Sequence, residues 1–259
     1  MLTASVYFHS IMKDYSRTLA ATAAEPAAAR QTKYFMANID QVKTPDDLIN
    51  NSNLYAYVMK AFGLSDMAYA KALIRKVLTG GISDPKSIAN TLNDSRYRAL
   101  AATFNFALKG PDTTSSWELQ QTTVSRYVEQ TLESNAGEQN PGTQMALYFQ
   151  RMAPHITSAY AILGDKKLLS VVQTALGLPR SMSLEKIDVQ ARMITSQMRI
   201  SDLHDPVKLR RFIERFTAVY DSQNPIAAPT RPQSALLVNS PRIDSDLLLS
   251  LAKLRLGGS

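Results

Sequence analysis

Apolar side chains recur along the chain with the spacing of a helix that buries one face. Three stripes occupy positions i, i+3, i+4 and i+7: Leu54, Tyr57, Val58 and Ala61; Leu168, Val171, Val172 and Ala175; and Ala70, Leu73, Ile74 and Val77. This period of about 3.6 residues is typical of amphipathic α-helices. No run alternates between apolar and polar residues with a hairpin turn after it, so we predict no β-sheet.

Helix start and stop signals divide the chain between these stripes. Pairs of a capping residue and proline, which suit the first helical turn, are Thr44-Pro45, Asp84-Pro85, Asn140-Pro141 and Asp205-Pro206. Glycines that follow apolar runs, where a helix end favours a left-handed residue, are Gly63, Gly80, Gly110, Gly137, Gly164 and Gly177. The signals predict helices near 5–24, 27–39, 45–50, 53–62, 66–79, 85–92, 95–109, 116–135, 141–152, 155–163, 166–176, 184–198 and 206–221.

The two halves of the chain repeat each other. Tyr34-Phe35 recurs as Tyr148-Phe149, 114 positions later. The same offset relates the first two stripes above, and it relates Gly63-Leu64 to Gly177-Leu178. The matched residues are core positions and helix ends, which specify a fold. We therefore predict an all-α, pseudo-symmetric two-copy repeat of about 12 helices, with modules at 1–110 and 115–221.

The last segment, 222–259, differs in character from the modules. Four prolines between 225 and 241 predict an extended linker. An apolar stripe at helical spacing then predicts a C-terminal amphipathic helix through Ile243, Leu247, Leu248, Leu251 and Leu254. This helix either folds back on the modules, which we favour slightly, or binds a protein partner or a second copy of the chain. Its polar face is mixed in sign, which disfavours a membrane surface.

Composition and charge narrow the classes of function. With 45% hydrophobic and 20% charged residues the chain is typical of globular proteins, and the absence of cysteine excludes disulfides and thiolate chemistry. The net charge of +7 allows acidic partners. In the densest basic segment, 208–215, however, basic residues are interspersed with apolar ones, which is typical of the solvated face of an amphipathic helix. We expect no nucleic-acid partner, no secretory signal peptide and no membrane span.

Residues that could carry chemistry do not form a recognisable motif. His9, His155 and His204 lack metal-ligand spacing, and the Ser-x-x-Lys matches Ser83–Lys86 and Ser183–Lys186 fall where helices begin. We interpret Glu129 and Glu133 as a solvated helix face, and Trp117 as a contact between the modules. We therefore predict a protein that is not an enzyme and has no catalytic, cofactor-binding or metal-binding residues.

Several sequence blocks, taken in order, resemble a known bacterial family over roughly residues 5–221. They are TKYFMANIDQVKTPDDLINNSNLYAYVMKAFGL, which starts at Thr32, then SDMAYAKALIRKVLTGGISDP, ALYFQRMAPHITSAYAIL, TALGLP and DPVKLRRFIERFTAVYD. Together they resemble the domain-of-unknown-function family 1217 (DUF1217). The resemblance implies an association with flagella, because genes of this family lie among flagellar genes, often near those for the basal-body rod. It implies no catalytic residues.

Three functions follow as hypotheses. The first is a non-enzymatic interaction or scaffold protein of flagellar assembly or motility, which is cytoplasmic or associated with the basal body. The second is a cytoplasmic export chaperone or regulator that holds a flagellar subunit. The third is a helical enzyme without a known motif, for which Ser183, Lys186 and His155 are the candidate residues.

Overall fold

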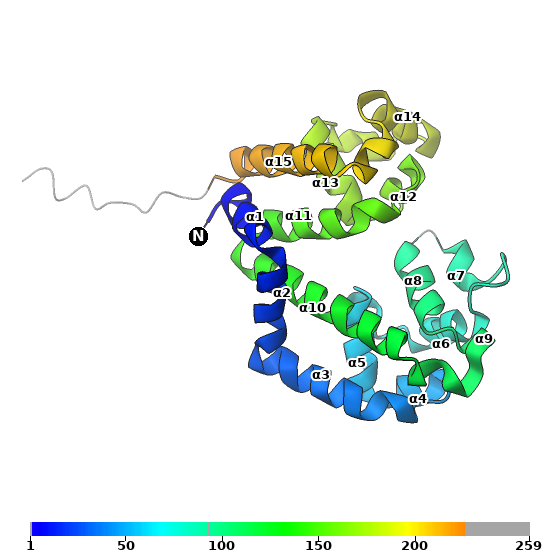
Figure 1. Ribbon diagram of the computed structural model, residues 1–259. Helices are drawn as coiled ribbons and strands as arrows, with labels where there is room; N and C mark the ends of the chain where they lie inside the picture. Colours follow the sequence, from blue (N-terminus) through cyan, green and yellow to red (C-terminus); the bar gives the residue numbers. More distant parts are fainter. Residues whose placement is uncertain (1, 93, 226–259) are drawn as a thin grey trace, which may run out of the picture. The chain divides into compact units, whose positions relative to one another are not determined.

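The computed structural model describes residues 2–92 and 94–225. Within this part of the chain all regular structure is helical, which confirms the predicted all-α class (Figure 1). The α-helices are α1 Ala4–Lys13, α2 Tyr15–Ala24, α3 Pro26–Asn38, α4 Pro45–Asn50, α5 Ser52–Ala61, α6 Lys71–Gly80, α7 Ile88–Thr91, α8 Ser95–Thr103, α9 Phe106–Lys109, α10 Trp117–Gln139, α11 Pro141–Met152, α12 Ala159–Leu163, α13 Lys166–Leu176, α14 Ile187–Gln197 and α15 Pro206–Gln223. Short 3-10 helices are η1 Ile39–Gln41, η2 Ser65–Met67, η3 Gly110–Ser115, η4 Ala153–His155, η5 Arg180–Leu184 and η6 Ile200–His204.

The offset of 114 residues relates whole elements as well as single residues. The series α3, η1, α4 and α5 recurs as α11, η4, α12 and α13. Thr44 and Ser158, 114 positions apart, both cap the next short helix with their hydroxyl groups. Gly63 and Gly177 follow α5 and α13 with φ angles of 67° and 68°, a conformation that favours glycine over other residues.

The buried apolar residues form two cores, and two helices cross between the repeats to complete them. The first core collects residues between 28 and 127, and the second collects residues between 132 and 216 together with Phe8 and Ile11 of α1. The first half of α10 contributes Leu119 and Tyr127 to the first core, and its second half contributes Leu132 to the second. In Figure 1, α10 accordingly extends from one group of helices to the other.

This packing amounts to an exchange of helices between the repeats. At an offset of 112, Phe8 and Ile11 of α1 correspond to Gln120 and Thr123 of α10, and all four are buried. Each equivalent segment packs against the core of the other repeat. The predicted modules 1–110 and 115–221 therefore do not coincide with the two cores. Helix α1 belongs to the first predicted module but packs in the second core, and the start of α10 belongs to the second module but packs in the first core.

Polar contacts connect α1 to α15. The carboxylate of Asp221 in α15 accepts hydrogen bonds from the backbone nitrogens of Ala4 at 2.7 Å and Ser5 at 3.0 Å. A carboxylate at a helix start also complements the helix dipole. At Gly142 the backbone of α11 approaches both helices, since an added Cβ would lie 2.9 Å from the Ala4 Cβ and would overlap the Tyr220 ring.

Several predicted helices divide or begin later than expected, so the described residues contain fifteen α-helices where about 12 were predicted. The segment 5–24 breaks at Asp14, whose side chain accepts a hydrogen bond from the Arg17 backbone and caps α2. Asp84-Pro85 is a turn, and α7 begins only at Ile88. The segment 95–109 divides at Phe104 into α8 and α9.

Two further sequence predictions are wrong. Trp117 does not pack between modules, because it begins α10 and is 73% exposed. Gly137 does not end a helix but lies inside α10, and neither Gly80 nor Gly164 has a positive φ, which belongs to Gly81 instead.

No helix among the described residues is long and apolar enough to cross a bilayer. The predicted C-terminal helix, with its candidate partner-binding residues Ile243, Leu247, Leu248, Leu251 and Leu254, lies outside the described residues.

Candidate functional site

An open groove with apolar walls runs between α1 and α15. It has a volume of about 720 Å³, and we call it the α1–α15 groove. Its apolar lining is Val6, Phe8, Met12, Pro206 and Ala218. Because α1 already buries Phe8 and Ile11 in the second core, Val6 lies on the opposite side of the helix and is 54% exposed. The groove thus presents apolar surface that the fold of the described residues does not cover.

The rim of this groove is mainly basic. His9 and Lys13 of α1 and Arg210 of α15 are exposed around it, and Glu214 is the acidic residue in the same lining. The basic segment 208–215 has its charged residues exposed while Leu209 and Ile213 are buried, which confirms the predicted amphipathic face. An apolar floor with a basic rim suits a polypeptide partner with an apolar stripe and acidic flanks.

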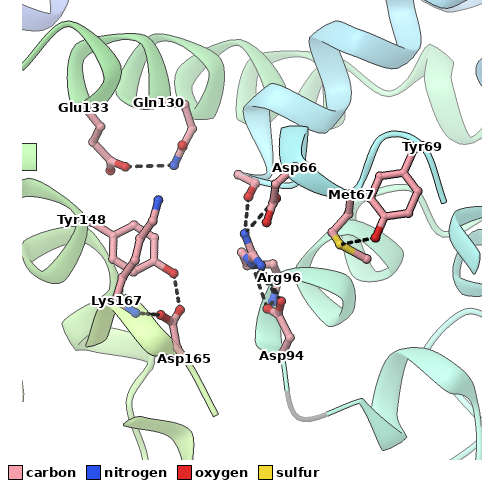
Figure 2. A network of polar contacts seen from close by, with 11 residues as sticks. Asp66, Met67, Tyr69, Asp94, Arg96, Gln130, Glu133, Tyr148, Asp165 and Lys167 are labelled. Atoms are coloured by element: carbon pink, nitrogen blue, oxygen red, sulfur yellow. Dashed lines mark hydrogen bonds and ion pairs between the residues drawn. The ribbon is translucent and has the colours of Figure 1, made fainter. Parts of the chain in front are cut away.

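A second, polar cleft lies between the two repeats and has a volume of about 750 Å³. One wall comes from the first repeat, where Arg96 binds Asp94 through its Nε at 3.0 Å and its Nη2 at 2.7 Å (Figure 2). Arg96 also donates to the carbonyl of Gly63 and lies 3.6 Å from Asp66. Burial alone would lower the pKa of Arg96, but its bonds to Asp94 outweigh burial and raise it. Arg96 therefore joins the end of α5 to the start of α8.

The facing wall comes from the second repeat, where the hydroxyl of Tyr148 donates to the Oδ2 of Asp165. Asp165 also caps α13, with its Oδ1 accepting from the backbones of Lys167 at 2.8 Å and Leu168 at 3.1 Å. Burial and the adjacent Asp165 raise the pKa of Tyr148, so its hydroxyl keeps its proton and remains a donor. The Lys167 ammonium lies 5.2 Å from the centre of the Tyr148 ring (Figure 2). Asp94 and Asp165 are thus hydrogen-bonded to residues of their own repeats. We therefore interpret this cleft as a structural contact between the repeats.

A third cleft, of about 570 Å³, is lined by residues of α10 and α11 and by Tyr15 of α2, and we call it the Arg126 cleft. Its floor includes Arg151, whose Nε lies 2.6 Å from the Oε1 of Glu133. Glu133 is only 5% exposed, so the prediction that it belongs to a solvated face is wrong. The sequence does not reveal this because Arg151 is on the next helix and 18 residues away.

The structure does not bring the predicted candidate residues into one site. His9 lines the α1–α15 groove, His155 lines the Arg126 cleft, and the Nε2 of His204 lies 2.9 Å from the backbone oxygen of Ile156. Ser183 and Lys186 are exposed around η5 and away from the Arg126 cleft, which contains His155 but neither of them. No group of three metal-binding side chains gathers within the described ranges.

Several polar residues of the clefts belong to no motif in the sequence. Arg96 and Arg126 are single charged residues in otherwise ordinary helical stretches, and Tyr148 stands out only as a repeat position. Asp165 does carry a signal, because it aligns with the capping residue Asn51 at the offset of 114.

Comparison with known proteins identifies the family. The model of a family described as "protein of unknown function (DUF1217)" matches residues 61–209. The X-ray crystal structure of a protein from Agrobacterium tumefaciens is 40% identical, with a TM-score of 0.79, and the match covers 87% of this chain and 98% of that one. No functionally curated protein matches. The match between residues 61 and 209 and the similar crystal structure confirm the family resemblance, and the chain belongs to the DUF1217 family of proteins of unknown function.

Proposed function

We propose that this chain is a non-enzymatic interaction protein of flagellar assembly or motility, and that the α1–α15 groove binds its partner. The observation that carries the proposal is the uncovered apolar lining of that groove, where Val6 is 54% exposed. An apolar groove between two helices is suited to an amphipathic helix laid along it. The flagellar association is supported by the family resemblance of the sequence.

The basic rim indicates which charge the partner carries. Lys13 and Arg210 would lie beside the edges of a bound helix, where acidic residues complement them. We therefore propose an amphipathic helix with acidic flanks in a flagellar component, and rod subunits are the first to test because the resemblance implies genes that often lie near those for the basal-body rod.

The groove can be tested by placing a charge in it. Val6→Glu and Met12→Glu put a carboxylate on the apolar lining at positions that are not fully buried. We expect each to weaken binding to purified rod subunits by at least about tenfold, or ~1.4 kcal/mol. Leu108→Glu is the matched control, because Leu108 is 73% exposed on α9 and outside the groove. Swimming of the strains that carry these variants should follow the same order.

Two outcomes would contradict the proposal. One is that no flagellar component binds the chain and a deletion strain swims normally. The other is that Leu108→Glu weakens binding as much as Val6→Glu does, which would place the contact elsewhere. A truncated chain without residues 226–259 distinguishes binding at the groove from binding by the predicted tail helix, because the groove lies wholly within the described residues.

The same groove also suits an export chaperone, which would hold an apolar helix of a subunit before export. Cell fractionation distinguishes the two roles. A chaperone remains in the cytosol with unexported subunit, whereas a structural component is recovered in purified basal bodies.

A further inference from the structure

Arg126 occupies an unusual position in the Arg126 cleft. Its guanidinium lies 5.1 Å from the centre of the Phe62 ring, so that one face is covered by an aromatic ring. The side chain is partly buried, yet among the described residues its guanidinium takes part in no ion pair or hydrogen bond. A guanidinium carries five N–H donors in a planar fork that matches a carboxylate or phosphate. Arg126 is therefore available to an anion that enters the cleft.

Glu129 is available in the same way to a cation. It lies three residues further along α10, so its side chain is near Arg126, but the two do not form an ion pair within 4.0 Å. Burial raises the pKa of Glu129, and burial lowers the pKa of Arg126. Burial outweighs the opposite charges nearby, which are Arg151 and Arg126 for Glu129, and Glu129 for Arg126.

The other arginine of the cleft, Arg151, already has a partner of opposite charge in Glu133. The Nε of Arg151 lies 2.6 Å from the Oε1 of Glu133, and its Nη2 lies 3.2 Å from the Oε2. His155 adds no cation at neutral pH, because burial and the two arginines lower its pKa. The groups left for a ligand are thus one guanidinium and one carboxylate, which lie three residues apart on α10 and both line the cleft.

Neutral donors complete the lining. The pKa of Tyr15 is raised to about 12 by burial and by Glu129 and Glu133, so its hydroxyl stays protonated. The side chains of Gln121, Ser125 and Gln150 also line the cleft. The volume of about 570 Å³ falls within the range of about 300–1,000 Å³ that small-molecule sites occupy.

We propose that the Arg126 cleft binds a small zwitterion of the amino-acid class, with its carboxylate on Arg126 and its protonated amine on Glu129. A simple anion would leave Glu129 as a repelling charge, and a simple cation would leave Arg126 uncompensated. A molecule with both groups neutralises both residues at once. This site is separate from the α1–α15 groove, so it can fail while the proposed function stands.

The test uses the full-length protein and isothermal titration calorimetry with each free protein amino acid at millimolar concentration. For the amino acid that binds best, the N-acetyl derivative removes the ammonium charge, and the amide removes the carboxylate. We expect both derivatives to lose at least tenfold in affinity. Because these measurements use unaltered protein, a folding defect cannot explain them.

Variants assign the two contacts. Arg126→Gln and Glu129→Gln should each weaken binding of the best amino acid by tenfold or more. Glu138→Gln, an exposed position on the same helix, and Arg30→Gln, an exposed position on α3, should not. The proposal is overturned if no amino acid binds, or if the variants leave the affinity unchanged. It is also overturned if the N-acetyl derivative binds as well as the free amino acid, because the cleft would then be a site for anions alone.

Discussion

The buried pair Glu133–Arg151 provides the sharpest test of how this fold is stabilised. The side chains of Arg151 and Glu133 are 17% and 7% exposed, and their closest atoms are 2.6 Å apart. On the surface, Arg75 and Asp46 approach to 2.5 Å but are 48% and 56% exposed. The two pairs therefore have nearly the same closest contact, but the buried pair has two hydrogen bonds where the surface pair has one, and the two pairs differ strongly in burial.

Removing one partner should have very different costs in the two places. Arg151→Met leaves the buried Glu133 carboxylate with Gln130, at 3.2 Å, as its remaining side-chain donor. Breaking a buried pair in this way costs about 3–5 kcal/mol, because an uncompensated charge stays in a low-dielectric site. Arg75→Met should cost about 0–1 kcal/mol, since water solvates the charge that remains.

The measurement is the free energy of unfolding in urea, taken for each single variant and for the double variants Glu133→Gln/Arg151→Met and Asp46→Asn/Arg75→Met. The buried double variant should recover much of the loss, because it removes both charges. Circular dichroism of each variant confirms that the helical fold is retained. The reasoning is refuted if Arg151→Met costs no more than Arg75→Met, or if the buried double variant is as unstable as the sum of its singles.

Three further predictions concern packing, capping and pH. Gly142→Ala should lower the free energy of unfolding by about 1–3 kcal/mol, because its Cβ meets the Tyr220 ring, whereas Gly80→Ala, whose Cβ would lie 3.7 Å from its neighbour, should not destabilise. Thr44→Ala and Ser158→Ala should each cost about 1 kcal/mol in thermal unfolding, because they cap equivalent helices. Bonds from the Lys208 and Val207 backbones lower the pKa of Asp205, so its contribution to stability is present above its usual pKa of 3.8 and is lost as the pH falls through the lowered pKa; Asp205→Asn should reduce this acid sensitivity in pH-dependent unfolding.

The repeated part of the fold was predictable because its signals are local. The caps Thr44 and Ser158, and the glycines at 63 and 177, determine where helices start and end, and they recur at one offset. The exchange of α1 for the start of α10 was not predictable. It depends on contacts between distant residues, such as the bond from Ala4 to Asp221, which are 217 positions apart.

The candidate sites were less predictable than the fold, for the same reason. The predicted helix over 5–24 does not reveal that Val6, on the side of α1 away from the second core, lines a groove with α15. Similarly, Glu129 and Glu133 look alike in the sequence because they are four residues apart on one helix. Only the position of Arg151 makes one of them a buried ion-pair partner and leaves the other facing a cleft.

The exchange of helices also explains why the α1–α15 groove can be rigid although one wall is a ten-residue helix near the chain's start. An isolated helix of that length is marginal in water. Here α1 buries Phe8 and Ile11 in the second core, and Asp221 fixes its first turn to α15, which is the opposite wall of the groove. The same contacts that complete the core therefore set the spacing of the two walls. A partner helix would meet a preformed surface, so little of its binding free energy would be lost in ordering α1.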